Sequence, residues 1–330
     1  MTTIKDVAAA AQVSTATVSA VLNGTAYVSP DLRERVERAV RDLAYLPSRA
    51  ARALRRGRSE LIALSVADLG NPFYAEIVRA SQAAAEAAGY ALILFNSDER
   101  PSKEAQILTR VRALECDGLI LVPVGASDDY GSLTGGTPKV LIGRSLDSPV
   151  DSVTLDNRAA GRRATEYLLD LGHTRIGTIA GRLATSTGAG RLAGLREAMA
   201  ARGLAPDPDH VQSGDFREAL AYSLTIEMMD RPDRPTALYI ANGVMALGSM
   251  RALSDLGLRC PEDVSLVSTD TVSGHGGVSP RLTRTEHPVG EMTDEAVRLL
   301  IDRIEGGTTP PRRRVYAPTL IVGNSCRPLR

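Results

Sequence analysis

The strongest constraint on the fold of this chain is an alternation of apolar strands with amphipathic helices that runs from Leu61 almost to the C-terminus. The first apolar runs are LIALSV, ALILFN, GLILVP and KVLIG, with helices expected at residues 74–88 and 103–114. The pattern recurs in SVTLD, RIGTIAG, ALYIA and VSLVS, with helices expected at 159–171, 190–202 and 244–256 and another after Phe216. Because apolar strands separated by helices form parallel sheets covered on both faces, the sequence predicts two doubly wound α/β lobes, which place ligands at the carboxyl ends of their strands.

The first 46 residues show a different pattern, typical of three short helices. Thr3 with Asp6 forms a capping box that opens the first helix. Ser14 and Gly24 bound the second helix, and a Ser-Pro pair opens the third. Two short helices joined by a tight turn and braced by a third form a helix-turn-helix, whose second helix can enter a DNA major groove. The alternative is an ordinary three-helix bundle.

The polar face of the second helix favours the DNA-binding interpretation. It is expected to expose small hydrogen-bonding side chains, which suit phosphates and base edges at close approach. A merely solvated face more often carries Lys and Glu. The residues concerned are Ser14, Thr15, Thr17, Ser19 and Asn23.

Residues 47–59 are unusually basic. The run SRAARALRRGR holds five arginines and no acid, with Leu54 as its one large apolar side chain. Such charge density is typical of phosphate binding, and a lone leucine within it can wedge between base steps in a minor groove. The alternative is a solvated charged hinge. The first 60 residues hold ten Lys+Arg and six Asp+Glu, which is a net charge of +4. The other residues hold 29 Lys+Arg and 33 Asp+Glu, a net charge of −4, so the neutrality of the whole chain conceals a basic N-terminal part.

Composition excludes several other classes of protein. With 330 residues and 43% hydrophobic residues the chain can bury real cores. Three widely spaced cysteines predict neither disulfides nor a zinc site, and the four histidines show no metal-ligand spacing. We expect a cytoplasmic protein without metal or membrane span, because the start lacks a signal-peptide pattern and no long apolar stretch follows.

At this point the motifs carry a resemblance to the lac repressor and galactose repressor family of bacterial transcription regulators. The matching segments are TIKDVAAAAQVSTATVSAVLNG, VSPDLRERVERAVRDLAYLPSRAARALRRGRS, NPFYAEI and ANGVMALGSMRALSDLGLRCPEDVSLV. The resemblance spans nearly the whole chain. It implies a ligand-responsive repressor that binds pseudo-palindromic operator DNA as a homodimer. Its expected parts are a headpiece (1–46), a hinge helix (47–59) and a core resembling periplasmic sugar-binding proteins (60–330).

The resemblance also implies which residues contact double-stranded DNA. Thr15 and Ala16 match the base-reading positions, and Leu54 matches the hinge leucine that opens the central base step. Ala20 stands where most relatives have an arginine that can bond guanine, so we expect the half-site to lose its guanine preference there. The remaining contacts are assigned to Thr3, Ser14, Thr17, Ser19, Asn23, Arg49, Arg52 and Arg55.

A small effector, such as a sugar, a sugar derivative or another polar metabolite, is implied in the cleft between the lobes. Arg191 matches the family arginine that grips ligand hydroxyls or carboxylates, which suits its guanidinium fork. Phe73 and Tyr74 either stack on the ligand or pack within the lobe. The other expected effector-binding residues are Arg144, Phe216, Asn242 and Asp270.

The expected cleft departs from the family pattern in its acids. Gly243 follows Asn242 where relatives carry Asp, and Gly143 precedes Arg144 where an acid is frequent. With such carboxylates missing, we expect Arg144 and Arg191 to be relatively unopposed, which favours a ligand bearing a carboxylate or phosphate.

Two other functions fit parts of the sequence less well. The stretch 188–193 fits G-x-G-x-x-A, but six residues separate it from the preceding strand, so the phosphate-cradling turn of a nucleotide-cofactor enzyme is not built. We expect neither enzymatic activity nor a cofactor. A solute-binding transport protein would lack residues 1–58. The expected mechanism is a coupling free energy of about 1–3 kcal/mol between effector binding and operator binding. It would change the affinity for operator DNA by about 5- to 150-fold.

Overall fold

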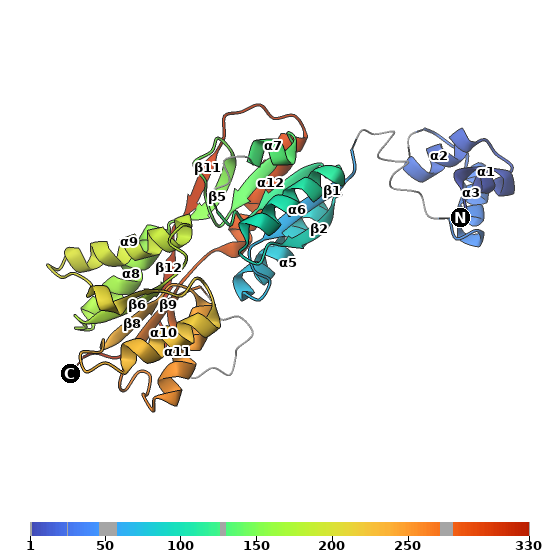
Figure 1. The fold of residues 1–330 in the computed structure, drawn as a ribbon. Coiled ribbons are helices and arrows are strands. Elements are labelled where there is room, and N and C mark those ends of the chain that lie inside the picture. The colour runs from blue at the N-terminus through green and yellow to red at the C-terminus, as the bar shows by residue number, and fades with distance from the viewer. Residues whose placement is uncertain (1, 25, 46–57, 126–129, 271–279, 330) are drawn as a thin grey trace. The chain divides into compact units, whose positions relative to one another are not determined.

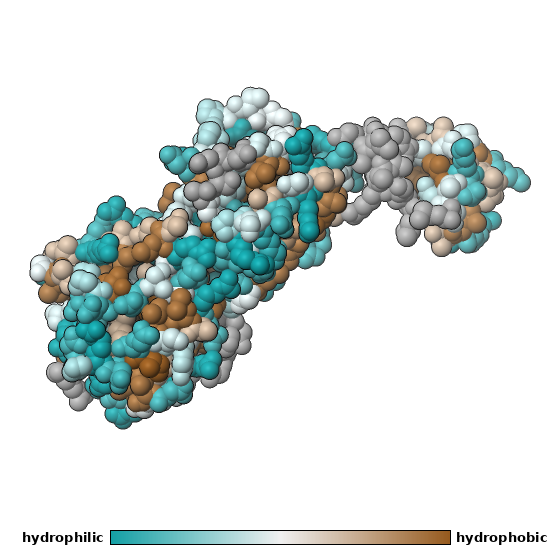
Figure 2. Space-filling view, viewed as in Figure 1, coloured by the Kyte–Doolittle hydropathy of each residue, from teal (hydrophilic) through white to brown (hydrophobic). Residues whose placement is uncertain are grey.

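The computed structural model describes residues 2–24, 26–45, 58–125, 130–270 and 280–329. The chain forms two compact units, residues 1–59 and 60–330 (Figure 1). No helix of the described residues is long and apolar enough to cross a membrane. The face of the larger unit seen in Figure 2 mixes hydrophilic and hydrophobic residues.

The first unit contains three helices, α1 (Ile4–Ala11), α2 (Thr15–Asn23) and α3 (Pro30–Asp42). The predicted capping box is confirmed, because Thr3 accepts from the backbone of Asp6 while the Asp6 side chain accepts from Thr3. Ser14 caps α2, and Gly24 ends it in the left-handed conformation that glycine adopts without strain. The helices pack around buried valines and alanines, which are Val7, Ala8, Ala11, Val18, Val21, Val36 and Ala39.

The first lobe of the larger unit is a parallel six-stranded sheet in the order β11-β5-β4-β3-β1-β2. Its strands are β1 (Leu61–Val66), β2 (Ala91–Asn96), β3 (Gly118–Leu121), β4 (Lys139–Ile142), β5 (Asp151–Leu155) and β11 (Arg313–Tyr316). Helices α5 (Pro72–Ala87) and α12 (Val289–Ile304) pack on one face. Helices α6 (Pro101–Ala113) and α7 (Tyr130–Thr134) pack on the other.

The second lobe is a six-stranded sheet in the order β12-β10-β9-β8-β6-β7, parallel except for the antiparallel pair β10 and β12. Its strands are β6 (Ile176–Ala180), β7 (Val211–Ser213), β8 (Ala237–Ile240), β9 (Ser265–Thr269), β10 (Thr283–Glu286) and β12 (Thr319–Ile321). Its helices are α8 (Asn157–Asp170), α9 (Ser186–Ala200), α10 (Glu218–Met229) and α11 (Gly243–Asp255), with a short 3-10 turn η1 (Pro208–His210). The pair α8 and α9 covers one face, and α10 with α11 covers the other.

The chain passes between the lobes after β5, after β10 and after β11 (Figure 1). The predicted two-lobed, doubly wound fold is therefore confirmed. The predicted start of one helix was wrong: α9 begins at Ser186 rather than Gly190, because the Thr185 side chain accepts from the Gly188 backbone and caps it there. The glycines that resembled a nucleotide-binding loop thus lie inside a helix.

Candidate functional site

Helix α2 presents its N-terminal end as the candidate DNA-reading surface. Ser14, Thr15 and Ala16 are exposed, and Ser14 accepts a hydrogen bond of 3.1 Å from the Thr17 backbone. That bond satisfies one of the free N–H groups at the start of the helix. Ser14 therefore has a structural role whether or not it contacts a phosphate.

The polar residues predicted to lie on the exposed face of α2 differ in exposure, since Ser14 and Thr15 are exposed and the other three only in part. Thr17, Ser19 and Asn23 are only half-exposed, and so is Ala20. The Asn23 amide donates to the Ser19 backbone oxygen at 2.7 Å and to its hydroxyl at 3.2 Å. Because an amide in the last turn of a helix can bond carbonyls of its own helix, part of this face holds the helix together. Four of the proposed DNA contacts, Arg49, Arg52, Leu54 and Arg55, lie outside the described residues.

The larger unit contains a cavity between its two lobes, and all seven predicted effector-binding residues line it. They reach it from the carboxyl ends of strands of both sheets, as doubly wound folds require. The free space is about 30 Å³, room for one or two water molecules. The lining residues are Asp68, Asn71, Phe73, Tyr74, Glu99, Gly143, Arg144, Leu155, Thr187, Arg191, Phe216, Asn242, Asp270, His287 and Met292.

Arg144 is not unopposed in this cavity, so that expectation was wrong. Its guanidinium makes two hydrogen bonds to the carboxylate of Glu99, at 2.9 and 2.5 Å, and a third to the Pro123 carbonyl at 3.1 Å. Both side chains of the pair are less than 5% exposed. Glu99 follows β2, 45 residues before Arg144, and only the sheet order brings the two together. The first-lobe side of the cavity therefore has no excess charge from this pair.

Arg191 is also paired, on the second-lobe side. Its Nη1 lies 3.3 Å from Asp270 Oδ2 and donates to the Ala241 carbonyl at 2.5 Å, while its Nε donates to Asn157 at 2.9 Å. Gly161 of α8 makes this placement possible, because a Cβ there would collide with the Arg191 carbonyl. The guanidinium is fixed from three sides.

Asp270 holds a negative charge at the cavity wall. Burial alone would raise the pKa of its carboxyl, but nearby His287 and Arg191 outweigh burial and lower the pKa to about 2. Its backbone lies in the left-handed region, at φ 71°, which is strained for a residue with a side chain. The surrounding fold therefore keeps an ionised carboxylate at this point.

Several buried polar atoms of the cavity have no hydrogen-bond partner among the described residues. Asp270 Oδ1 lies 3.0 Å from His287 Nδ1 but out of hydrogen-bond alignment, and His287 Nε2 is also unpartnered. The Asn242 Oδ1 atom caps α11 by accepting from the Met245 backbone, which leaves Nδ2 as an unpartnered donor. Unsatisfied buried polar atoms are costly, so the wall of this cavity offers hydrogen-bonding capacity that the described residues do not use.

Aromatic rings form the apolar part of the wall. Phe73 packs edge-on against Tyr74 and against His287, with ring centroids 5.2 and 5.4 Å apart. The Arg144 guanidinium lies 5.3 Å from the centre of the Phe216 ring. Phe73 and Tyr74 also belong to the core of the first lobe, which confirms the packing alternative, while their stacking on a ligand stays a prediction.

Hydrogen bonds join the two lobes beside the cavity. Arg182, after β6, donates to the Glu99 carbonyl at 2.7 Å and pairs with Asp215 of its own lobe at 2.6 Å. Arg217 donates to the Asp98 carbonyl at 3.0 Å. We call these contacts the interlobe clasp. Asp98 and Glu99 both have left-handed backbones, at φ 52° and 56°, which turn their carbonyls toward the second lobe's arginines.

Sequence reasoning missed Glu99, Arg182 and His287. His287 follows directly after β10, whose residues TRTE alternate between buried and partly buried but carry no apolar alternation that would mark the strand in the sequence. Glu99 lies in the polar stretch NSDER, where nothing distinguishes it from a solvated loop acid.

A helix-turn-helix unit followed by a two-lobed α/β core with a polar cavity defines a ligand-responsive DNA-binding regulator. Two family profiles agree: "Bacterial regulatory proteins, lacI family" matches residues 3–48, and "Periplasmic binding protein-like domain" matches residues 165–326. The HTH-type transcriptional regulator CelR of Thermobifida fusca is 37% identical, covering 98% of both chains. The HTH-type transcriptional repressor PurR of Escherichia coli O139:H28 is 34% identical, covering 97% of this chain and 96% of that protein.

Solved structures give the same result. A CelR–cellobiose complex matches with a TM-score of 0.75 and 34% identity, covering 98% of this chain and 100% of that one. A lac repressor dimer bound to operator and the anti-inducer ONPF matches with a TM-score of 0.89 and 26% identity, covering 99% of each chain. The chain belongs to the lacI family of bacterial regulatory proteins. It is a ligand-responsive, DNA-binding transcriptional repressor and not an enzyme.

Proposed function

We propose that the effector of this repressor is a neutral, hydroxyl-rich molecule of the sugar class, bound in the cavity between the lobes. The observation that carries this proposal is the charge pairing of the wall. Arg144 is neutralised by Glu99 and Arg191 by Asp270, so an added phosphate or carboxylate would find no unpaired guanidinium. This replaces the anionic ligand that the sequence favoured.

The unpartnered atoms of the wall suit alcohol groups. A hydroxyl donates one hydrogen bond and accepts others, so neighbouring hydroxyls can donate to Asp270 Oδ1 and accept from Asn242 Nδ2. The rings of Phe73 and Phe216 supply apolar surface for the C–H faces of a sugar ring. The CelR–cellobiose complex, which matches over nearly the whole chain, supports this class of ligand.

Binding of such an effector requires a rearrangement of the core. The free space of about 30 Å³ is far smaller than a sugar, so the lobes must separate or wall side chains must move. The interlobe clasp is the set of contacts that such a separation would break. We propose that breaking the interlobe clasp couples effector binding in the cavity to a change in the relative position of the two lobes.

The effector class is tested by isothermal titration of the intact chain. The panel is cellobiose, glucose, their phosphorylated derivatives, nucleosides and organic acids, and the matched variant is Asn242→Leu. We expect a neutral sugar to bind and its phosphorylated form not to bind, with the neutral sugar weakened in the variant. Binding of the phosphorylated form alone would contradict the proposal.

On the DNA side, we propose that a cytoplasmic homodimer binds a pseudo-palindromic operator, with Thr15, Ala16 and Ala20 of α2 facing base edges. The exposed N-terminal end of α2 and the operator-bound lac repressor dimer support this arrangement. The other proposed contacts are Thr3, Ser14, Thr17, Ser19 and Asn23. Light scattering of the intact chain should give twice the chain mass, and a chain starting at Glu60 should lose operator binding. A monomer on operator DNA would contradict the proposal.

A further inference from the structure

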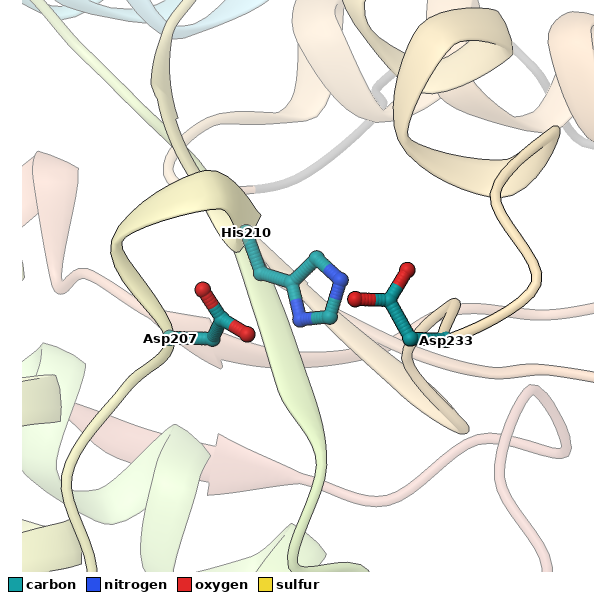
Figure 3. A group of neighbouring side chains, drawn as sticks. All are labelled: Asp207, His210 and Asp233. Carbon is teal, nitrogen blue, oxygen red and sulfur yellow. The ribbon is translucent and has the colours of Figure 1, made fainter.

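A second polar cluster lies in the second lobe, at the opposite edge of the sheet from the effector cavity. It consists of Asp207, His210 and Asp233 (Figure 3). His210 ends η1 and immediately precedes β7, while Asp233 lies in the connection between α10 and β8. The cluster therefore joins the amino ends of two strands, whereas the effector cavity lies at their carboxyl ends. One oxygen or nitrogen atom from each side chain lies within 4.8 Å of the others.

The histidine of this cluster is buried without a hydrogen-bond partner. His210 is 3% exposed, and its Nε2 atom has no partner among the described residues. Figure 3 shows the ring between the two carboxylates, with one ring nitrogen facing Asp233. Buried imidazole nitrogens are normally bonded to protein groups, water or metal. An unpartnered nitrogen on a buried ring that lies between two carboxylates indicates that a ligand belongs there.

The carboxylates are exposed and can adjust. The Asp207 side chain accepts from the Asp209 backbone at 3.0 Å. Asp233 pairs with Arg231 at 3.1 and 3.4 Å, and the same guanidinium also contacts Asp209 at 2.8 Å. The hydrogen bond from Arg231 is the main cause that lowers the pKa of the Asp233 carboxyl, so this carboxyl is ionised at neutral pH. Exposed ion pairs of this kind contribute little to stability, so Arg231 is a weak competitor for Asp233.

We propose that Asp207, His210 and Asp233 bind a divalent transition-metal ion of the zinc class, with water completing the coordination. One imidazole nitrogen and two carboxylate oxygens are ligands that zinc accepts, whereas Mg²⁺ and Ca²⁺ prefer oxygen alone. At metal–ligand distances of about 2.0–2.2 Å, tetrahedral ligands lie roughly 3.3–3.5 Å apart. Ligand atoms that lie within 4.8 Å of one another can reach this spacing through side-chain rotations of the two exposed carboxylates.

The bound ion would fasten the edge strand β7 to the α10–β8 connection. Strand β7 is the short outer strand of its sheet and pairs only with β6 among the described residues. A metal that bridges its start to the neighbouring connection adds a constraint that the hydrogen bonds of the sheet do not supply. The site would thus stabilise the second lobe without touching the effector cavity.

The proposal is tested by titrating Zn²⁺ into the intact chain and into the double variant Asp207→Asn/Asp233→Asn. We expect one saturable event in the wild type, with an affinity reduced by more than about tenfold in the double variant. The control Asp230→Asn removes a carboxylate from the same connection without removing a ligand, and it should bind zinc as the wild type does. Far-ultraviolet circular dichroism establishes that each variant is folded.

Two further measurements distinguish this site from other metal-binding groups. Arg231→Gln should bind zinc more tightly, because the substitution frees Asp233 from its ion pair. Co²⁺ should give tetrahedral d–d absorption without a thiolate charge-transfer band, since the ligands contain no sulfur. Equal affinities of wild type and double variant, a thiolate band, or no binding by the wild type would each overturn the proposal.

Discussion

The buried pair of Glu99 and Arg144 offers the sharpest test of how the cavity is built. We consider Glu99→Gln, which keeps the shape of the side chain and removes its charge. The guanidinium would lose one of its two carboxylate bonds and face an amide N–H₂ instead, keeping only the Gln oxygen and the Pro123 carbonyl as acceptors. Arg144 would remain charged, because a guanidinium does not lose its proton in a protein, and its side chain would stay buried beside the Phe216 ring.

The expected cost follows from that geometry. Removing one partner from a buried ion pair costs about 3–5 kcal/mol, because the remaining charge stays buried without compensation. Since two acceptors remain for Arg144, we expect the lower end, about 3 kcal/mol. Replacing both residues, in Glu99→Gln/Arg144→Met, should restore much of the loss, because no buried charge is left and Met can pack on Phe216.

Urea denaturation followed by far-ultraviolet circular dichroism measures these free energies of unfolding, because the chain has no Trp to report by fluorescence. The same variants can be titrated with a sugar phosphate. Glu99→Gln should gain affinity for it, because Arg144 becomes unopposed, and the double variant should not. A loss under about 1 kcal/mol in Glu99→Gln, with no rescue in the double variant, would refute the reasoning.

Three other predictions follow from the same structure. Arg182→Ala removes the interlobe hydrogen bond to the Glu99 carbonyl and should raise the apparent effector affinity by up to about tenfold, because the arrangement of the lobes with the small cavity loses stability; calorimetry showing weaker binding would contradict this. Asp270→Asn should lower stability near neutral pH, and its deficit should shrink as pH falls from about 4 toward 2. The folded-state pKa of Asp270 is lowered to about 2, so the stability it contributes is present above its ordinary pKa of 3.8 and lost as it protonates; a deficit constant down to pH 2 in acid-to-neutral denaturation series would count against it. Ala20→Arg should restore a guanine preference at one position of each half-site, measured by selection from random DNA; an unchanged consensus would exclude this residue from base reading.

Local features of the chain were sufficient to predict its elements. Capping depends on residues three apart, as in Thr3 with Asp6, and strands depend on short apolar runs. The order of strands and helices then required parallel sheets and placed the cleft at their carboxyl ends. For these reasons the fold class and the helix-turn-helix could be predicted from local patterns, whereas the seven predicted effector-binding residues, all of which line one cavity, came from the family resemblance.

The charge balance of that cavity was decided only by the tertiary structure. Glu99 meets Arg144 across 45 residues, and Arg182 meets the Glu99 carbonyl across 83 residues and between lobes. Such pairings depend on strand order, on left-handed turns and on the closure of two separate sheets, none of which leaves a periodic signal in the sequence. Sequence patterns report which side chains face a core or a cleft, whereas the electrostatics of a buried site depend on which of them lie within hydrogen-bond distance.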